Sequence, residues 1–389
     1  MSRFSSADKR IRIKIERPGS LEGNSPHKRR LNLPTQEIEG WSAQDAFREL
    51  YQFWFDAIAE SFSLIGGFTQ TYEESAGSVT VKATLKGIPG YLGFIEYSKV
   101  TKRVSLVVAD YHLLSTEAGT TVEVNNRDST IAGLFKFRNE RIKLAALSLC
   151  KDGCKFSINS RDRYWVFELE GSGSLLMCKT ACMRESAVGE IERRTKSIST
   201  LRSRQSKDVS IFINSDTTLI YMGMFRHWLT VALDICDFSL PSETITTVYG
   251  DILLDRKFSG KVFLQGVLLP ETKLGRGKFT YGYNLQHATV SGNRRSFSSP
   301  QEEAMRLCRI WEAAIAQKAA NALQKYVFLL TDRCGPLDIS DAQNHLSAST
   351  VKAIWAYLRH MDGGKNFYHA NIPSDVRLHE RMTLVGMAG

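Results

Sequence analysis

Two pairs of cysteines have a spacing that would allow them to bind a metal ion. They are Cys150-x3-Cys154 and Cys178-x3-Cys182, and the strand-like segments between them are able to bring the pairs together. Four thiolates suit a tetrahedral zinc ion. However, three intervening residues are less usual than two, and Cys150 lies on the apolar face of a predicted helix, where cysteine commonly packs as a small hydrophobic residue. We therefore expect no bound metal, with zinc at these four residues as the alternative.

A row of acidic residues lies along one side of a helix predicted over residues 43–62. Glu49, Asp56 and Glu60 stand on this side with Phe53 among them, at offsets of four, seven and eleven residues from Glu49. The opposite side carries apolar residues at helical spacing and is expected to face the core. A phenylalanine within an acidic row is unusual for a surface helix, although a solvated helix face is the alternative interpretation.

The familiar short signatures of catalysis are absent from the sequence. There is no G-x-x-x-x-G-K-[ST] phosphate loop, because the basic turn at 275–278 lacks the upstream glycine. There is also no H-E-x-x-H, G-x-S-x-G or C-x-x-C motif, and the histidines are scattered without metal-ligand spacing. The informative segments are therefore the helix with the acidic row and an alanine-rich helix further along the chain.

The elements that would position these residues indicate an α+β protein. Ser42, with Asp45 three residues on, is expected to cap the first helix. A change of composition at 237–243 marks a boundary, and Pro300 with two early glutamates marks the start of a long helix. We expect helices over 43–62, 138–149, 219–235, from 299 onward and over 338–359, and strands over 78–85, 91–97, 104–109, 154–158, 164–169, 174–179, 208–213, 246–254, 260–268 and 278–283.

The net charge of +10 is concentrated in two segments. Residues 1–36 hold nine basic and three acidic side chains, and residues 184–207 hold seven basic and three acidic, so the rest of the chain is close to neutral. The first segment is typical of a disordered arm and contains basic residues that resemble a nuclear-import signal, with a solvated tail as the alternative. These residues are Lys9, Arg10, Lys28, Arg29 and Arg30. The second segment is expected to be a loop between strands that contacts phosphates weakly.

Length and composition favour a soluble intracellular protein of two or three domains. The chain has 389 residues, of which 43% are hydrophobic and 24% charged, which is ordinary for a globular protein. No apolar run is long enough to span a membrane, and there is no apolar signal-peptide core. Seven cysteines, an odd count, favour a reducing compartment with few or no disulfides.

Two segments together resemble the ATP-binding fold of the GHKL superfamily (gyrase, Hsp90, histidine kinase, MutL), in the form seen in microbial Hsp90-like proteins. The segment 48–57, R-E-L-Y-Q-F-W-F-D-A, is similar to the opening helix R-E-L-x-x-N-x-x-D-A of that family. The segment 139–147, N-E-R-I-K-L-A-A-L, is similar to its later box G-x-G-E-G-x-K-L-A-A-L. Downstream, 249–254, 260–267 and 281–284 resemble the second, transducer-like domain of such proteins.

The resemblance implies roles for individual residues, and this sequence departs from several of them. Glu49 stands where the glutamate of the family activates water, but Phe53 replaces the asparagine that holds Mg²⁺, and a phenylalanine offers no oxygen ligand. Asp110 keeps the acid of the adenine-binding D-x-G-x-G box without its glycines, and Arg141 replaces a lid glycine whose backbone would cradle phosphate. The implied nucleotide-binding residues, vestigial here, are Phe53, Asp56, Asp110, Arg138, Arg141 and Lys143.

These departures imply a pseudo-ATPase. We expect a disordered basic arm (1–40), a degenerate GHKL-like α/β sandwich with a mixed sheet covered by helices (41–238), a transducer-like α/β domain with the long helix (239–330) and a C-terminal helical segment (331–389). Losing the metal ligand and the glycines together should abolish phosphoryl transfer.

The expected function is that of a non-catalytic interaction protein, nuclear or nucleocytoplasmic, with a protein partner, without a cofactor and without membrane association. A homodimer is a further expectation, because GHKL proteins often form dimers. One alternative is a nucleic-acid-associated protein that uses 1–36 and 184–207. A second alternative is a residual ATPase or an ATP-gated clamp that binds Mg-ATP, with Glu49 as its general base.

Overall fold

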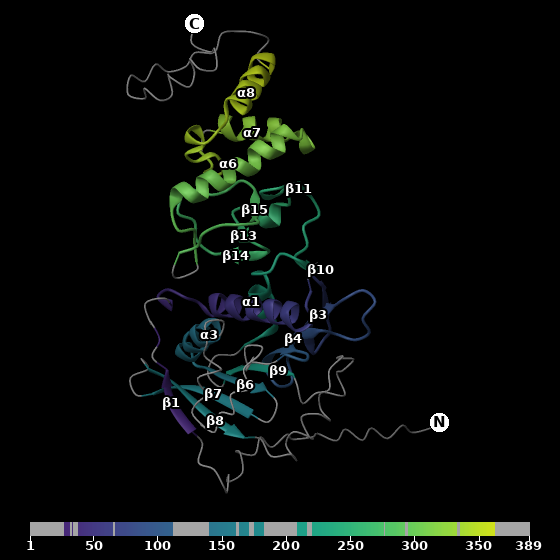
Figure 1. Cartoon of the computed structure of the whole chain (residues 1–389), viewed down its shortest axis with the longest axis vertical. Coiled ribbons are helices and arrows are strands. Elements are labelled where there is room, and N and C mark those ends of the chain that lie inside the picture. The colour runs from purple at the N-terminus through teal and green to yellow at the C-terminus, as the bar shows by residue number, and fades with distance from the viewer. Residues whose placement is uncertain are drawn as a thin grey trace, which may run out of the picture.

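The protein is elongated, with two sheets and their helices arranged one above the other (Figure 1). The computed structural model describes residues 27–31, 33, 38–64, 67–111, 140–160, 163–170, 175–182, 208–215, 220–275, 277–291, 295–332 and 335–361. Within these residues the chain is an α+β protein with six α-helices, one ten-stranded mixed sheet and one five-stranded sheet, and neither sheet closes into a barrel. None of the helices in the described ranges combines the length and apolarity that crossing a membrane requires.

The ten-stranded sheet is antiparallel except at one edge, where β10 runs parallel to β2. In β3 the buried residues Val79, Val81 and Ala83 alternate with half-buried ones, because one face of the sheet packs against helices. The spatial order is β1 (His27–Leu31), β8 (Leu175–Cys182), β7 (Arg163–Glu170), β6 (Cys154–Ser160), β9 (Val209–Ser215), β5 (Arg103–Val108), β4 (Gly93–Ser98), β3 (Ser78–Thr84), β2 (Thr69–Glu74) and β10 (Ile235–Cys236).

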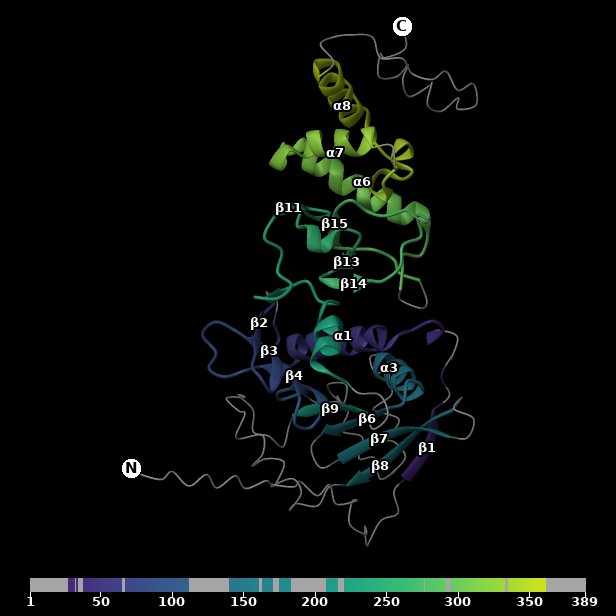
Figure 2. The same cartoon turned by 180° about the vertical axis from the view of Figure 1, so that it is seen from behind.

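Three helices accompany this sheet, and the first carries the acidic row. They are α1 (Ala43–Ser61), α3 (Glu140–Lys151) and α5 (Met222–Leu229). The predicted start of α1 is confirmed: the Ser42 side chain accepts from the Asp45 amide and the Asp45 carboxylate accepts from the Ser42 amide, which is a complete capping box. The indole of Trp54, fully buried, donates to the carbonyl oxygen of Val107 at 2.9 Å and so ties α1 to β5. In Figures 1 and 2, α1 and α3 lie on the side of the sheet that faces the rest of the molecule.

The five-stranded sheet is covered by a helical layer. Its order is β11 (Thr244–Thr247), β12 (Gly250–Leu253), β15 (Gly282–Leu285), β13 (Val262–Leu264) and β14 (Val267–Leu269), with only β13 and β15 parallel. The long helix α6 (Pro300–Ala316) begins as predicted, because the Ser299 hydroxyl accepts from the Glu302 amide and Pro300 occupies the first turn. Helices α7 (Ala322–Thr331) and α8 (Ala348–Met361) follow, and α8 lies at the end of the molecule furthest from the ten-stranded sheet (Figure 1).

Two large apolar cores divide the molecule into two lobes. The N-terminal lobe comprises β1 to β10 and the C-terminal lobe comprises β11 to α8. Leu337 and Ile354 belong to the second core, so the described segment 335–361 packs on the same core as the five-stranded sheet. The buried Asp338 carboxylate accepts from the Thr280 amide at 2.6 Å and from the Tyr283 hydroxyl at 2.5 Å, which holds this segment against the strand β15.

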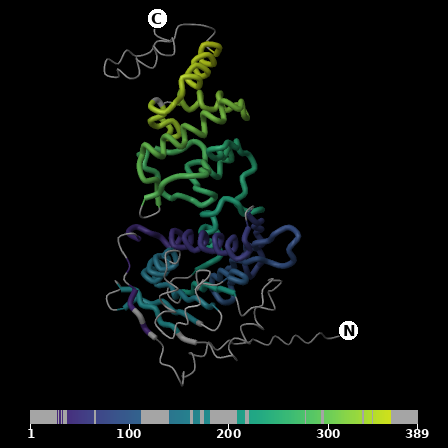
Figure 3. Tube along the Cα trace, viewed as in Figure 1, coloured from purple at the N-terminus to yellow at the C-terminus, as the bar shows by residue number. Residues whose placement is uncertain are grey.

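The expectation of a disordered arm over residues 1–40 is wrong at His27–Leu31. This segment is strand β1, and it pairs antiparallel with β8 in a register that places Arg29 opposite Cys178. In Figure 3 this early segment, in purple, lies at the edge of the teal strands of the large sheet, where it neighbours β8. Leu31 is buried, and the Lys28 ammonium lies 2.8 Å from a carboxylate oxygen of Glu170, so an apolar anchor and an ion pair compensate for the charged composition of the strand. Residues 1–26, with Lys9 and Arg10, lie outside the described residues.

Other predicted boundaries differ for local reasons. The predicted helix over 219–235 is the short helix α5, because the Leu233 amide donates to the Gly266 carbonyl oxygen and draws the following segment out of the helix. The single strand predicted over 246–254 is the hairpin of β11 and β12. The helix predicted over 338–359 begins only at Ala348, since Asp338 is bonded to the neighbouring strand segment. Strand β2, with the polar sequence T-Q-T-Y-E-E, was not predicted.

Candidate functional site

The guanidinium of Arg141 bridges two carboxylates on α1. Glu49 and Asp56 lie two helical turns apart on the same side of α1, and Arg141 comes from the first turn of α3. Its Nε lies 3.8 Å from Glu49 Oε2 and its Nη1 lies 3.2 Å from Asp56 Oδ2. The Glu49 side chain is 4% exposed and that of Asp56 is 57% exposed, so the bridge runs from the interior to the surface. A cation supplied by the chain itself thus lies against the predicted catalytic glutamate.

Phe53, the phenylalanine of the acidic row, stands between these two residues in the sequence of α1 and is buried. Phe53 is 5% exposed, and its ring packs edge-on against Tyr111 with the centroids 5.8 Å apart. Tyr111 lies three residues beyond the end of β5 and directly follows Asp110, so this contact joins α1 to the turn that carries the predicted adenine-binding acid. An aromatic pair of this geometry contributes about 1 kcal/mol beyond the area that it buries.

Asp110 lies beside the same strand end in a conformation that glycine usually takes. Its φ is 53°, which costs an ordinary side chain about 1 kcal/mol or more. Its amide donates to Asp208 Oδ1 at 3.1 Å, and this bond holds the turn. The positions at which the adenine-binding box would carry glycine lie outside the described residues, as does Arg138.

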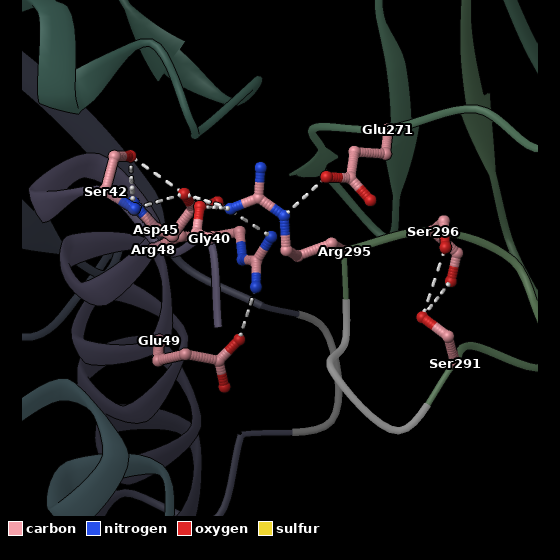
Figure 4. Close-up of polar contacts among 9 residues, drawn as sticks. All are labelled: Gly40, Ser42, Asp45, Arg48, Glu49, Glu271, Ser291, Arg295 and Ser296. Atoms are coloured by element: carbon pink, nitrogen blue, oxygen red, sulfur yellow. Dashed lines mark hydrogen bonds and ion pairs between the residues drawn. The ribbon is translucent and has the colours of Figure 1, made fainter. Parts of the chain in front are cut away.

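A buried arginine extends the bridge toward the start of α1. The side chain of Arg48 is 3% exposed, and it lies between Glu49, at 3.0 Å, and Asp45, at 3.6 Å. Asp45 in turn pairs with Arg295 of the C-terminal lobe, and Arg295 Nε lies 2.8 Å from Glu271 Oε1 (Figure 4). Acidic and basic groups therefore alternate across the interface between the lobes, in the order Glu271, Arg295, Asp45, Arg48, Glu49, Arg141 and Asp56.

The structure brings only part of the predicted nucleotide-binding set together. Glu49, Phe53, Asp56 and Arg141 meet on one side of α1. Lys143 follows Arg141 by two residues on α3, and side chains at this separation do not share a helix face. Arg48, Asp45 and Arg295 were not predicted to be site residues. The i, i+3 spacing of Asp45 and Arg48 was a usable signal, whereas nothing local indicates that Arg295 lies beside them.

The basic residues of β1 are engaged within the sheet. Lys28 and Arg30 both pair with Glu170 of β7, at 2.8 Å and 3.4 Å, and their side chains are 42% and 69% exposed. Ion pairs this exposed to water contribute little to stability. The Glu170 carboxylate nevertheless lies next to Lys28 and Arg30, two of the residues predicted to contact phosphate or an import receptor.

The zinc site considered as an alternative would draw two of its ligands from one strand. Cys178 and Cys182 both lie on β8, and four residues of a strand span about 13 Å, too far for ligands of one zinc ion. Among the described residues no group of three or more metal-binding side chains is close enough to hold an ion. Burial raises the pKa of Cys150 to about 12, of Cys154 to about 11 and of Cys178 to about 12, so these thiols are protonated at neutral pH.

Comparison with known proteins does not place the chain in a family. No protein-family model matches the sequence, and no curated protein matches it. The chemistry open to the site therefore follows from its geometry alone. A base must be able to accept a proton from a substrate or water, but Glu49 is buried and in contact with two guanidinium groups, Arg48 and Arg141.

Proposed function

We propose that the protein is a non-catalytic interaction protein built on a degenerate GHKL-like ATP-binding fold. The observation that carries this proposal is the bridge from Arg141 to Glu49 and Asp56. In the family that the sequence resembles, a glutamate at the position of Glu49 activates water and a metal-bound triphosphate lies beside it. Here a guanidinium takes the place of the metal cation and neutralises the same carboxylates.

The packing of Phe53 supports the same proposal. Its ring stands at the position of the asparagine that holds Mg²⁺ in the family, and it is 5% exposed against Tyr111. A divalent ion requires oxygen ligands, and a packed aromatic ring excludes both the ion and its water shell. Phosphoryl transfer depends on metal-assisted charge neutralisation, so turnover is expected to be absent.

The overall arrangement is consistent with the two-domain organisation that the resemblance implies. A large mixed sheet with helices on one face precedes a smaller sheet covered by the long helix α6. We propose that these parts correspond to the degenerate GHKL-like domain and to the transducer-like domain. Their joint surface would then serve as a rigid platform for a protein partner rather than as a nucleotide-driven clamp.

Calorimetric titration of the full chain with Mg-ATP tests the proposal. We expect no binding heat at millimolar nucleotide and no phosphate release above a no-enzyme control. Glu49→Ala is the matched variant, because a true ATPase would lose turnover on this change while a pseudo-ATPase has none to lose. Measurable hydrolysis that Glu49→Ala abolishes would overturn the proposal in favour of a residual ATPase.

The nucleic-acid alternative and the nuclear location both draw on the basic segments. Within the described residues, Lys28 and Arg30 share Glu170, which weakens their attraction for phosphate. The segment 184–207 and the residues Lys9 and Arg10 lie outside the described residues. An import receptor reads an extended basic peptide, so recognition of Lys28, Arg29 and Arg30 would require β1 to leave β8. We therefore rank nucleic-acid association and nuclear location below the proposed interaction with a protein partner.

A further inference from the structure

Arg295 joins the two lobes at the N-terminal end of α1. It belongs to the C-terminal lobe, where Phe297, two residues on, is fully buried in the core. Its Nη1 donates to the Gly40 carbonyl oxygen at 3.0 Å and pairs with the Asp45 carboxylate, while its Nε contacts Glu271. Figure 4 shows the guanidinium between the first turn of α1 on one side and Glu271 on the other. One side chain therefore contacts both lobes.

The environment of this contact gives it more weight than an ordinary surface ion pair. The side chains of Arg295 and Asp45 are 13% and 7% exposed, whereas exposed pairs are screened by water and salt. Asp45 is also fixed in place, because its Oδ2 accepts from the amide and the hydroxyl of Ser42, both at 2.8 Å. Removing either partner would leave a mostly buried charge without its counter-charge.

A second connection between the lobes lies in the backbone. The Leu233 amide donates to the Gly266 carbonyl oxygen and the Leu268 amide donates to the Val231 carbonyl oxygen, each at 2.8 Å. These bonds lie where the chain passes from one lobe to the other, beside the strand β14. Apolar contacts surround them, since Leu233 belongs to a cluster with residues of the C-terminal lobe and β14 packs against the N-terminal core. Because all of these contacts are gathered at one place, the orientation of the lobes also depends on a contact away from it, which Arg295 supplies at the start of α1.

We propose that Arg295 is a latch that fixes the orientation of the C-terminal lobe relative to α1, with the backbone contacts at 231–233 as the pivot. With the latch closed, the lobes form one rigid body; with it open, they rotate about the pivot while each keeps its own core. The contact made by Arg295 does not depend on whether the chain binds a nucleotide. This inference therefore goes beyond the proposed function, and either proposal can be wrong while the other holds.

The test compares four variants of the full chain by hydrogen exchange and small-angle X-ray scattering. Arg295→Met removes the charge, and Asp45→Asn removes the partner charge while keeping an acceptor for Ser42. The double variant completes a cycle. Arg306→Met is the control, because Arg306 pairs only one turn away with Glu302 inside α6, at 3.2 Å, and its side chain is 27% exposed.

We expect Arg295→Met to raise exchange at least about tenfold at the Glu271 amide and in the first turn of α1, and to increase the radius of gyration. The amides of Leu233 and Leu268 at the pivot should keep wild-type rates. Asp45→Asn should raise exchange at the same amides. At the Glu271 amide the double variant should exchange no faster than Arg295→Met, since both changes remove the contact between Arg295 and Asp45; the loss of the pair between Asp45 and Arg48 adds only to the effect within α1. Arg306→Met should match the wild type.

Two results would contradict the proposal that Arg295 fixes the orientation of the lobes. The first is wild-type exchange and scattering in Arg295→Met, and the second is full additivity of the two single changes. If Arg295→Met does not fold, Arg295→Lys decides, because lysine keeps the charge but cannot contact Gly40, Asp45 and Glu271 at the same time. Faster exchange at the same amides in Arg295→Lys supports the latch, and unchanged exchange there rejects it.

Discussion

Arg141 of α3 lies against Glu49 of α1, with its Nε 3.8 Å from Oε2, although the two residues come from helices that the chain visits far apart. Glu49 also contacts Arg48, whose guanidinium is almost completely removed from water. The carboxylate therefore balances two positive charges, one buried and one half-buried. Replacing Glu49 should therefore lower the free energy of unfolding measurably, whereas replacing a solvated glutamate on a helix surface would not.

Glu49→Gln is expected to destabilise the protein by about 3 kcal/mol, because it leaves the buried Arg48 with one distant partner. Urea unfolding followed by far-UV circular dichroism measures this loss. Asp56→Asn is the matched control: its side chain is 57% exposed, so the loss of the same Arg141 partner should cost less than about 1 kcal/mol. Equal losses for the two variants would contradict a structural role for Glu49.

Leu31→Ala tests whether β1 is an integral strand. Leu31 is 7% exposed in the core of the N-terminal lobe, and truncation of such a leucine costs about 2–5 kcal/mol. Lys28→Ala in the same strand removes only an exposed ion pair and should stay within about 1 kcal/mol of the wild type. Chemical denaturation of both variants gives the comparison. A disordered arm would show no loss in either, which would reject the strand.

Asp338→Asn probes the attachment of the segment beyond α7. The amide group of asparagine presents N–H donors to a site in which Thr280, Tyr281 and Tyr283 already donate. We expect a loss of about 2 kcal/mol or more, since a buried donor is left unsatisfied. Thermal unfolding at neutral pH measures it, and a wild-type melting temperature would show that these bonds do not hold the segment.

The same carboxyl group predicts a dependence on pH. Burial raises the pKa of Asp338 above its ordinary value of 3.8, with the hydrogen bonds acting in the opposite direction. The folded state then binds the proton more tightly than the unfolded state, so the contribution of this group to stability is largest below pH 3.8 and falls as the pH rises through the native pKa. The stability difference between wild type and Asp338→Asn should therefore shrink from pH 4 to 7, and a difference that grows would contradict the raised pKa.

Thiol labelling tests the burial of the cysteines. Because only the thiolate reacts, native Cys150, Cys154 and Cys178 should react with iodoacetamide at pH 8 at least about tenfold more slowly than in urea. Mass spectrometry of the labelled peptides gives the rate for each site, with the half-buried Cys236 as an internal reference. Native rates equal to those in urea would show that these thiols are not buried.

The parts of the fold that the sequence predicted well are those with local signals. The capping pair Ser42 and Asp45 and the apolar stripe of α1 lie within one segment, and Pro300 marks α6 in the same way. Strand β1 lacked such a signal, because its charges match the composition of a disordered arm and its stability comes from pairing with β8. Strand β2 was missed for the related reason that its polar residues show no alternation.

The same distinction between local and long-range signals applies to the candidate site. Glu49, Phe53 and Asp56 were placed on one side of a helix by periodicity, and the structure has them there. That Arg141 would bridge the two acids depends on how α3 packs against α1, and periodicity does not determine the packing of two helices. The pairing of Asp45 with Arg295 depends on the docking of the two lobes, which no single stretch of sequence encodes.

The position of β1 at the margin of the large sheet has a practical consequence for dividing the protein into fragments. A fragment that begins at Trp41, the first residue of the expected GHKL-like domain, would lack β1 and leave the outer edge of β8 unpaired over Leu176–Thr180. Unpaired strand edges recruit other chains, so such a fragment is expected to self-associate more readily than the longer protein. Expression of the N-terminal lobe should therefore start upstream of His27.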